Sequence, residues 1–269
     1  MAEPWQLQLY RRSFKKKLTM RALLDHLPEV AGRRCLELGC ATGLTSYFLR
    51  QRGGDWLSCD FERDHVRSAR LLVGERVIQT GDSEVPFKDA SFDVVVAINF
   101  LEHIGDDARY FRDMVRVLKP GGDLLFMAPK GEKGRPGYAV KKLLGFTADQ
   151  GGFGHARDGY PPAAARQLFQ SNGVEVKGEA GYCRFFTEFL EDLLNYVYHR
   201  KSAAAKPEEG DDFHGSTAPM SEDALKNVGL AYRVFAAVHP LLRLWTALDA
   251  LIPFDRGYMM VMWGRKRTS

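Results

Sequence analysis

Short apolar runs alternate with helical segments along the first half of the chain, and this alternation restricts the fold more than any other feature. Five runs are rich in strand-forming residues and bounded by turn residues: 33–38, 55–60, 76–80, 92–99 and 122–129. Candidate helices lie between them, at 43–52, 62–73 and 105–118. Because strands that alternate with helices are joined by right-handed crossovers, this order predicts a mostly parallel sheet covered by helices on both faces.

Turn residues indicate where several of these elements begin and end. The Lys-Pro-Gly-Gly sequence at 119–122 predicts a tight turn that ends the third helix and starts the fifth strand. Pro162 is placed to begin a further helix and Gly173 to close it, and a sixth strand follows. The last strand is predicted within GYMMVMWGRK, near the end of the chain.

Length and composition are those of an ordinary globular protein. With 269 residues, of which 45% are hydrophobic and 27% charged, the chain can form one large domain or a domain with an addition. The four cysteines show neither CxxC spacing nor a matching set of histidines, which predicts reduced core thiols and no metal site. No signal peptide is recognised at the N-terminal end, so we expect a cytoplasmic protein.

Basic residues gather near the two ends of the chain, although the formal net charge is only +4. One group lies between Arg11 and Arg21, and the other is Arg265 to Arg267. A solvated helix face explains such a group most simply. Attraction to anionic lipid or to nucleic acid phosphate is the functional alternative.

A glycine-containing turn follows the first predicted strand, in the sequence CLELGCATG. Glu37 lies at the end of a buried strand, where a carboxylate is unfavourable unless a partner meets it. Gly39 and Gly43 do not have the spacing of the dinucleotide-binding fingerprint GxGxxG. Glycine lacks a Cβ atom, so the backbone of this turn can approach a ligand closely or adopt a positive φ angle.

ELGCATG resembles the first motif of the class I S-adenosylmethionine-dependent methyltransferases, with Ala41 in place of the middle glycine. The resemblance implies that Glu37 lies near the amino-acid part of the cofactor and contacts its ammonium group and nearby backbone amides. It also implies that the turn itself binds the cofactor, through Gly39, Cys40, Ala41 and Gly43. Asp60 follows Gly43 by 17 residues and, by the same resemblance, binds the ribose hydroxyls. A helix N-cap is an independent explanation for Asp60.

The stretch GDSEVPFKDASFDVVVAINFLEHI matches later motifs of the same family. The resemblance implies that Asp82 accepts from the adenine amino group with Ser83 beside it, and that Phe61 packs on the adenine ring. Asn99, at the end of the fourth strand, is expected at the cofactor. The resemblance covers 33–129 and is strongest to the ubiquinone/menaquinone-type small-molecule methyltransferases. It implies a doubly wound α/β fold with a seven-stranded, mostly parallel sheet.

Candidate catalytic residues follow the fourth and fifth strands. Glu102 and His103 come after the fourth strand, and His155 and Tyr160 lie in a glycine-rich stretch after the fifth. His103, His155 and Tyr160 are the predicted catalytic residues, because imidazole titrates near neutral pH and can take a proton from a hydroxyl. Either histidine could instead have a structural role. The Asn/Asp-Pro-Pro-Tyr motif of nucleobase amine methylation is missing, which argues against exocyclic amines of DNA or RNA as substrates. The preferred acceptor is a small or lipid-like molecule, methylated at oxygen.

The chain is predicted to have four parts: a basic helical segment at 1–32, the methyltransferase core at 33–184, a helical insertion at 185–256, and the last strand with a basic tail at 257–269. The insertion contains a polar stretch at about 201–219 and the apolar sequence VFAAVHPLLRLWTALDALIP.

Charged residues and a proline interrupt that apolar sequence, so we expect a lid, a dimer helix or a helix at a lipid surface, not a membrane span. Peripheral membrane contact is therefore one expectation, and the oligomeric state stays open. Two other functions fit the sequence: an RNA methyltransferase that uses the basic N-terminus, and a non-catalytic binding module with this fold.

Overall fold

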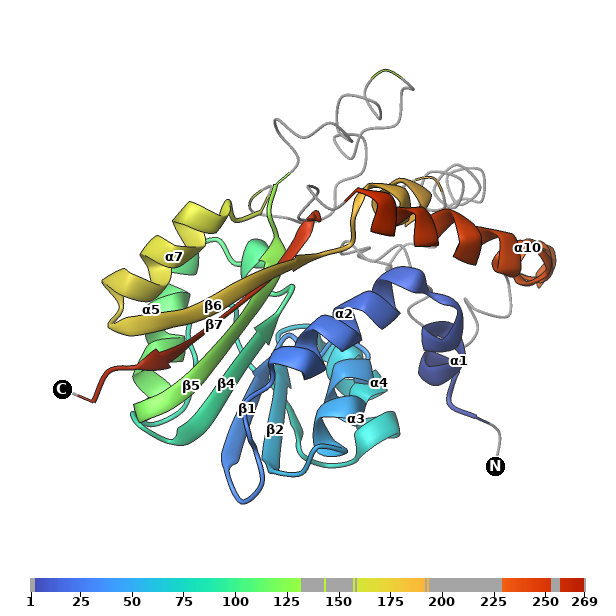
Figure 1. The fold of residues 1–269 in the computed structure, drawn as a ribbon. Helices are drawn as coiled ribbons and strands as arrows, with labels where there is room; N and C mark the ends of the chain where they lie inside the picture. Colours follow the sequence, from blue (N-terminus) through green and yellow to red (C-terminus); the bar gives the residue numbers. More distant parts are fainter. Residues whose placement is uncertain are drawn as a thin grey trace.

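A seven-stranded sheet forms the centre of the computed structural model, which describes residues 3–131, 143, 157, 159–191, 193, 229–252 and 257–268 (Figure 1). The strands are β1 (Arg34–Leu38), β2 (Asp55–Asp60), β3 (Val77–Gln79), β4 (Phe92–Ile98), β5 (Leu118–Pro129), β6 (Val174–Tyr182) and β7 (Met259–Lys266). Their order across the sheet is β3-β2-β1-β4-β5-β7-β6. The predicted doubly wound α/β fold with a seven-stranded, mostly parallel sheet is confirmed.

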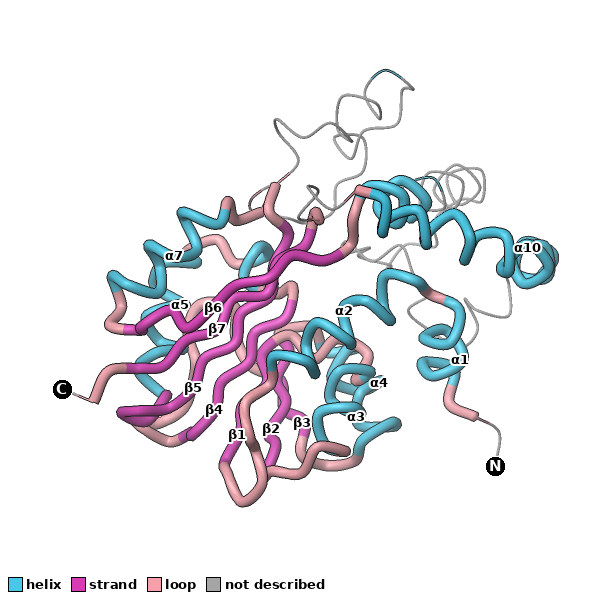
Figure 2. Tube along the Cα trace, in the orientation of Figure 1, coloured by secondary structure: helices cyan, strands magenta, loops and turns pink. Residues whose placement is uncertain are grey.

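Helices flank the sheet on both faces, as Figure 2 shows. They are α1 (Trp5–Arg12), α2 (Phe14–His26), α3 (Leu44–Arg50), α4 (Arg63–Val73), α5 (Asp107–Val117), α7 (Pro162–Ser171) and α10 (Gly229–Ala247), with the short 3₁₀ helices η1 (Leu101–His103) and η3 (Leu248–Leu251). The helices that follow β1, β2 and β4 agree with the three sequence predictions, and the helix begun by Pro162 is also present.

The directions of the strands predict where along the carboxyl-terminal edge of the sheet a ligand binds. Strands β1 to β5 pair in parallel, whereas β7 pairs antiparallel with both β5 and β6. The chain winds outward from β1 to β3 and then returns to β4 on the other side of β1. The carboxyl ends of β1 and β4 therefore meet at the point where the winding reverses, which is where open α/β sheets bind ligands.

The core lies on both faces of the sheet because β4 carries an unbroken apolar run from Val94 to Ile98. Val95 and Ala97 pack in the cluster that contains Phe111 of α5, whereas Val94 and Val96 pack in the cluster that contains helices α2 and α3. Successive side chains of a strand point to opposite faces, so a strand buried on both faces has an unbroken apolar run.

The prediction of a tight turn at 119–122 was wrong. β5 begins at Leu118, directly after α5, and Leu118 pairs with Phe92 of β4 before the register shifts towards Val94. Gly121 has a positive φ of 73° within this irregular part of the strand. Pairing with the neighbouring strand overrides the local turn preference, so the two glycines accommodate a bulge.

Helical segments occupy the described part of the chain between β6 and β7. Residues 185–191 are helical, and α10 and η3 follow. Asp249 of η3 accepts the backbone N–H of Phe186 at 2.7 Å and the Thr187 hydroxyl at 2.6 Å, which fastens the two helical segments together. The polar stretch at 201–219 lies outside the described residues. Among the described helices, none is both long and apolar enough to cross a membrane.

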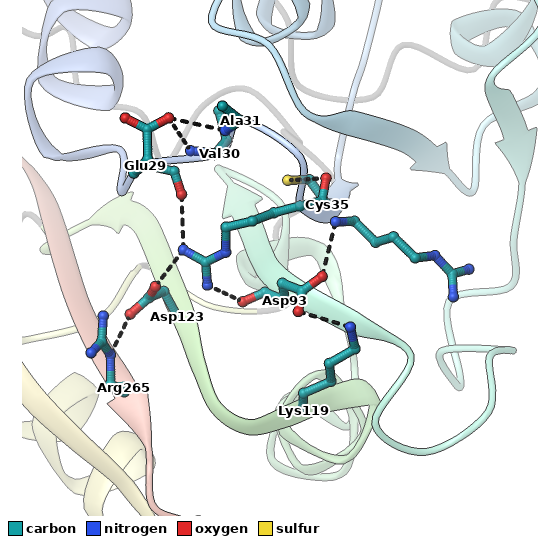
Figure 3. Close-up of polar contacts among 10 residues, drawn as sticks. Glu29, Val30, Ala31, Cys35, Asp93, Lys119, Asp123 and Arg265 are labelled. Carbon is teal, nitrogen blue, oxygen red and sulfur yellow. Dashed lines mark hydrogen bonds and ion pairs between the residues drawn. The ribbon is translucent and has the colours of Figure 1, made fainter.

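A polar network at the opposite, amino-terminal edge of the sheet fastens β1 to β4, β5 and β7 (Figure 3). The Arg33 guanidinium donates to the carboxylate of Asp123 and to the backbone carbonyl oxygens of Glu29 and Asp93, each at 2.8 Å. Arg265 of β7 donates to the same Asp123 carboxylate at 2.8 Å. Hydrogen bonds from the Lys119 ammonium and the Arg34 backbone N–H outweigh partial burial and lower the pKa of Asp93. One arginine thus connects the loop before β1 with two strands.

Replacement of this arginine should destabilise the fold. In Arg33→Met the Asp123 carboxylate and two carbonyl groups lose a charged donor, so we expect the free energy of unfolding to fall by about 1–3 kcal/mol. Arg52→Met, at an exposed position, is the matched control and should change it little. Urea unfolding measures both variants, and equal stability of the two would show that the network does not stabilise the sheet.

Candidate functional site

The turn after β1 requires glycine at both predicted positions. Gly39 has a φ of 80°, and a Cβ atom there would lie 2.6 Å from the Cβ of Phe100. Gly43 has a φ of 89°, and its Cβ would lie 2.7 Å from the Cα of Ala69 in α4. The left-handed backbone and the close packing both exclude a side chain. These glycines hold the turn tightly against the residues after β4 and against α4.

Asp60, at the end of β2, hydrogen-bonds across the edge of the sheet to this turn. Its Oδ2 accepts the Ala41 N–H at 2.8 Å, and its Oδ1 accepts the Glu62 N–H at 3.0 Å. His65 Nδ1 lies 3.1 Å from Oδ1, and the hydrogen bond and charge of Asp60 raise the pKa of this histidine although burial opposes it. The N-cap interpretation of Asp60 was wrong, because α4 begins after Glu62 and Asp60 accepts the N–H of Glu62 itself. Sequence reasoning missed His65, although its position five residues after Asp60, on the next helix, was a usable signal.

Glu37 is completely buried, and its carboxylate meets three hydroxyl groups. Ser46 and Ser58 donate to Oε2 at 2.5 and 2.6 Å, and Thr45 donates to Oε1. Burial raises the pKa of Glu37, and the three hydroxyl donors oppose the shift. We expected backbone amides as its protein partners, and the structure instead shows side chains of α3 and β2. Glu37 therefore joins β1, β2 and α3 directly beneath the glycine turn.

The N-terminal helix α1 also reaches the glycine turn. The side chain of Gln6 is buried, and its Nε2 donates to the carbonyl oxygens of Thr42 and Ser68, both at 3.4 Å. Nothing in the sequence around Gln6 indicates this contact, since the partners lie 36 and 62 residues away. The basic N-terminal segment therefore packs against the glycine turn through α1.

Two aromatic rings and an amide lie beside the glycine turn. Phe61 packs against Phe100 with ring centroids 5.6 Å apart. Asn99 adopts a positive φ of 47°, and its Oδ1 is buried without a hydrogen-bond partner among the described residues. Buried acceptors are nearly always paired in native proteins, so this oxygen marks a place where a donor is missing.

Glu102 of η1 presents a second buried oxygen at the same edge. Its side chain is 2% exposed, and its Oε2 has no hydrogen-bond partner within the part of the chain that the structure describes. Burial raises the pKa of Glu102 to about 8, with smaller opposing contributions from its own backbone N–H and from Lys15. It is an uncharged acid over much of the physiological pH range.

The other predicted site residues differ in how far they are buried. Asp82 and Ser83 are exposed in the loop after β3, and His103 is half-buried in η1, one residue after Glu102. Tyr160 is 1% exposed and donates its hydroxyl to Asp107 at 2.7 Å and to the carbonyl of Leu101 at 3.1 Å. Burial and the Asp107 carboxylate raise the pKa of Tyr160, so it is a poor base and instead fastens α7 to η1. His155 lies outside the described residues.

Comparisons with known proteins agree with this geometry. Residues 36–126 match the family model of a methyltransferase domain. The chain contains an S-adenosylmethionine-dependent methyltransferase domain. The matched span includes the glycine turn, Asp60, Asn99 and Glu102, and the cofactor of this family is S-adenosylmethionine.

Relatives with curated names match this methyltransferase domain and not the whole chain. Demethylmenaquinone methyltransferase of Beutenbergia cavernae is 34% identical over 110 residues, which are 40% of this chain and 46% of that protein. Ubiquinone biosynthesis O-methyltransferase of Methylococcus capsulatus is 32% identical over 116 residues, 40% of this chain and 48% of that protein. The chain thus spans just under half the length of these relatives.

A solved Bacillus halodurans structure covers more of the molecule. It matches 93% of this chain and 99% of its own with a TM-score of 0.58 at 16% identity. At this identity the likeness shows the fold alone.

The residues of the edge fit S-adenosylmethionine. The unpartnered Asn99 Oδ1 is the kind of acceptor that the ammonium of the cofactor's amino-acid part needs. The Asp60 Oδ2 accepts the Ala41 N–H, and a carboxylate oxygen has a second site that can accept from a ribose hydroxyl. Phe61 supplies a half-buried aromatic face beside these groups.

The raised pKa of Glu102 should make stability depend on pH. The ordinary pKa of 4.5 applies in the unfolded chain and a value of about 8 in the folded one, so folding favours the protonated acid. The stability of the native protein relative to Glu102→Gln should be greatest below pH 4.5, fall as the pH rises to about 8, and then stay constant. Denaturant unfolding across this range measures the difference. Glu84→Gln, at an exposed position, should give a flat difference, and a flat result for Glu102→Gln would show that the acid is not perturbed.

Proposed function

We propose that this protein transfers the methyl group of S-adenosylmethionine to an oxygen of a small or lipid-like acceptor. The observation that supports it most is the unpartnered buried Asn99 oxygen, which lies at the winding reversal and follows the strand next to the glycine turn held by Asp60. A chain that binds no ligand at this edge would have no reason to leave a buried acceptor unsatisfied there.

The protein residues have three tasks in this reaction. When bound, the cofactor supplies an electrophilic methyl group on a sulfonium centre. In this proposal Asn99 accepts from the ammonium group of the cofactor and Asp60 from its ribose hydroxyls, and the buried Glu37 keeps the turn between them rigid. Phe61 packs on Phe100 and offers an aromatic face to the adenine ring. Cofactor binding in this position aligns the methyl group, on which transfer in line with the leaving sulfur depends.

His103 and His155 stay proposed as groups that contact the acceptor. His103 is half-buried in η1, five residues after the end of β4 at the carboxyl edge of the sheet. Imidazole can take the proton of a hydroxyl near neutral pH. Tyr160 supports this region from beneath through its bond to Asp107.

The proposed acceptor class rests on the relatives and on α10. The two curated relatives are named for menaquinone and ubiquinone synthesis, whose products are quinones. In this chain, α10 and η3 expose Leu241, Leu244 and Leu251 at 67–73% of their surface. Such a row beside a methyltransferase domain is suited to an apolar acceptor or to the surface that holds one.

We also propose that α10 contacts an anionic lipid surface without spanning it. α10 lies beside α2 (Figure 1), and the rings of His239 and Phe14 stack 4.8 Å apart. Burial and the neighbouring positive charge of Arg243 lower the pKa of Lys17. Basic groups thus lie next to the exposed leucines, the combination that binds a helix to anionic head groups.

A charge in the apolar row should weaken this contact. Burial of one leucine side chain is worth about 1.5–3 kcal/mol, so Leu244→Glu should lower binding to phosphatidylglycerol vesicles by at least about tenfold. Leu71→Glu, at a position 84% exposed on α4, is the matched control and should bind like the native protein. Vesicle co-sedimentation measures both, and equal binding of the two variants would contradict the contact through α10.

Labelled methyl transfer tests the function directly. Native protein with methyl-labelled S-adenosylmethionine and fractionated cell extract should label the lipid or small-molecule fraction. Asp60→Asn loses one acceptor oxygen, so it should bind S-adenosylhomocysteine at least about tenfold more weakly and transfer little label, whereas the exposed control Asp64→Asn should do both normally.

The same experiment separates the alternative functions. Label in RNA would indicate an RNA methyltransferase. Cofactor binding without label in any fraction would indicate a binding module.

A further inference from the structure

Glu102 is a buried acid that the cofactor does not explain. It lies in η1, three residues after Asn99, where the chain leaves β4 at the carboxyl edge of the sheet. The glycine turn contacts this segment from the other side, because Gly39 packs directly against Phe100. Glu102 therefore lies at the carboxyl-terminal edge of the sheet, close in sequence to Asn99, which we assign to the cofactor.

The groups around Glu102 come from three other elements. Lys15 of α2 acts on Glu102 with its positive charge. The charge of Glu102 in turn contributes to the raised pKa values of Tyr182, at the end of β6, and of Tyr160, before α7, for both of which burial is the main cause. His103 is its neighbour on η1. Burial is thus the main cause of the raised pKa of Glu102, and the charge of Lys15 opposes it.

The hydrogen bonding of the carboxyl group is incomplete. Its Oε2 is buried without a partner among the described residues, whereas Glu37, buried to the same degree, has three hydroxyl donors. An unpaired buried acceptor is unfavourable by about 1–3 kcal/mol and persists where a ligand supplies the donor. The Glu102 Oε2 is therefore open to a donor that the described residues do not supply.

We propose that Glu102 binds the hydroxyl of the methyl acceptor and takes its proton during transfer, an inference that rests on the proposed function. As the acceptor oxygen forms its bond to the methyl carbon, the carbon–sulfur bond breaks and its electron pair stays on sulfur. The O–H proton moves to the Glu102 carboxylate, which later releases it to water. The products are the methyl ether and neutral S-adenosylhomocysteine, so atoms and charge balance.

The environment of Glu102 suits this task. A base works best when its pKa lies near the operating pH, and burial raises the pKa of Glu102 to about 8. An ordinary glutamate would be too weak a base to take a proton from a phenol-like hydroxyl. Lys15 limits the rise, so that a fraction of the carboxyl groups stays ionised near neutral pH.

The kinetic test uses the extract fraction that accepts label from the native protein. Glu102→Gln keeps the shape of the side chain and removes the base, so transfer should fall by at least about 100-fold while S-adenosylhomocysteine binding stays within twofold. The native rate should rise with pH through an apparent pKa near 8, and the residual rate of Glu102→Gln should lack this rise. Glu102→Asp should restore part of the pH-dependent rate, and the exposed control Glu84→Gln should behave like the native protein.

Two kinetic outcomes would overturn the assignment. Full transfer by Glu102→Gln with the native pH profile would show that another group, such as His103, takes the proton. Loss of S-adenosylhomocysteine binding in Glu102→Gln would make Glu102 a support for the cofactor.

A spectroscopic test does not depend on transfer. In protein labelled with ¹³C at glutamate carboxyl carbons, the resonance absent from Glu102→Gln belongs to Glu102. Catechol added to the protein saturated with S-adenosylhomocysteine should move this resonance, because a phenolic hydroxyl donates to the open oxygen. An unmoved resonance overturns the site. A moved resonance in a protein that labels no extract fraction supports the hydroxyl site and counts against only the proposed function.

Discussion

A buried carboxyl group needs hydrogen-bond donors, and the structure around the sheet edge is arranged by that need. Glu37 lies on the central strand β1 and is completely buried, where its carboxylate is stable because Thr45 and Ser46 of α3 and Ser58 of β2 donate to it. Transfer of a charged group from water into the protein interior is unfavourable by several kcal/mol unless such donors are present. Strand, helix and neighbouring strand are therefore bound to one side chain, and the glycine turn begins two residues later.

The acidic residues at this edge differ in whether protein groups donate to all of their carboxyl oxygens. Glu37 is saturated by protein donors and holds the turn, and Asp60 accepts two backbone N–H groups while keeping capacity for a ligand. Glu102 has an oxygen without a donor, as has the amide of Asn99. The satisfied group stabilises the fold, whereas the unsatisfied oxygens are the ones to which we assign the cofactor and the acceptor in our proposals.

The N-terminal helices and the chain between β6 and β7 close the same edge from outside. Gln6 of α1 reaches the glycine turn, Glu191 accepts the Lys15 N–H of α2 at 3.1 Å, and His239 stacks on Phe14. Segments from both ends of the chain thus pack around the site, and the exposed leucines of α10 lie on the outer side of this cover. A lipid surface and a cofactor pocket can be neighbours in such an arrangement without a membrane-spanning helix.

Apolar periodicity and glycine spacing are local properties, and they predict the strand and helix pattern of the first half, the glycine turn and the acidic residue at the end of β2. Long-range packing settles which donors meet Glu37, places Gln6 and His65 beside the glycine turn and Asp60, and brings the glycines at 119–122 into β5. It also decided that Tyr160 is held in the core while Glu102 keeps an open oxygen. These outcomes depend on which residues, distant in the chain, supply or withhold a hydrogen-bond donor, and no local pattern encodes that.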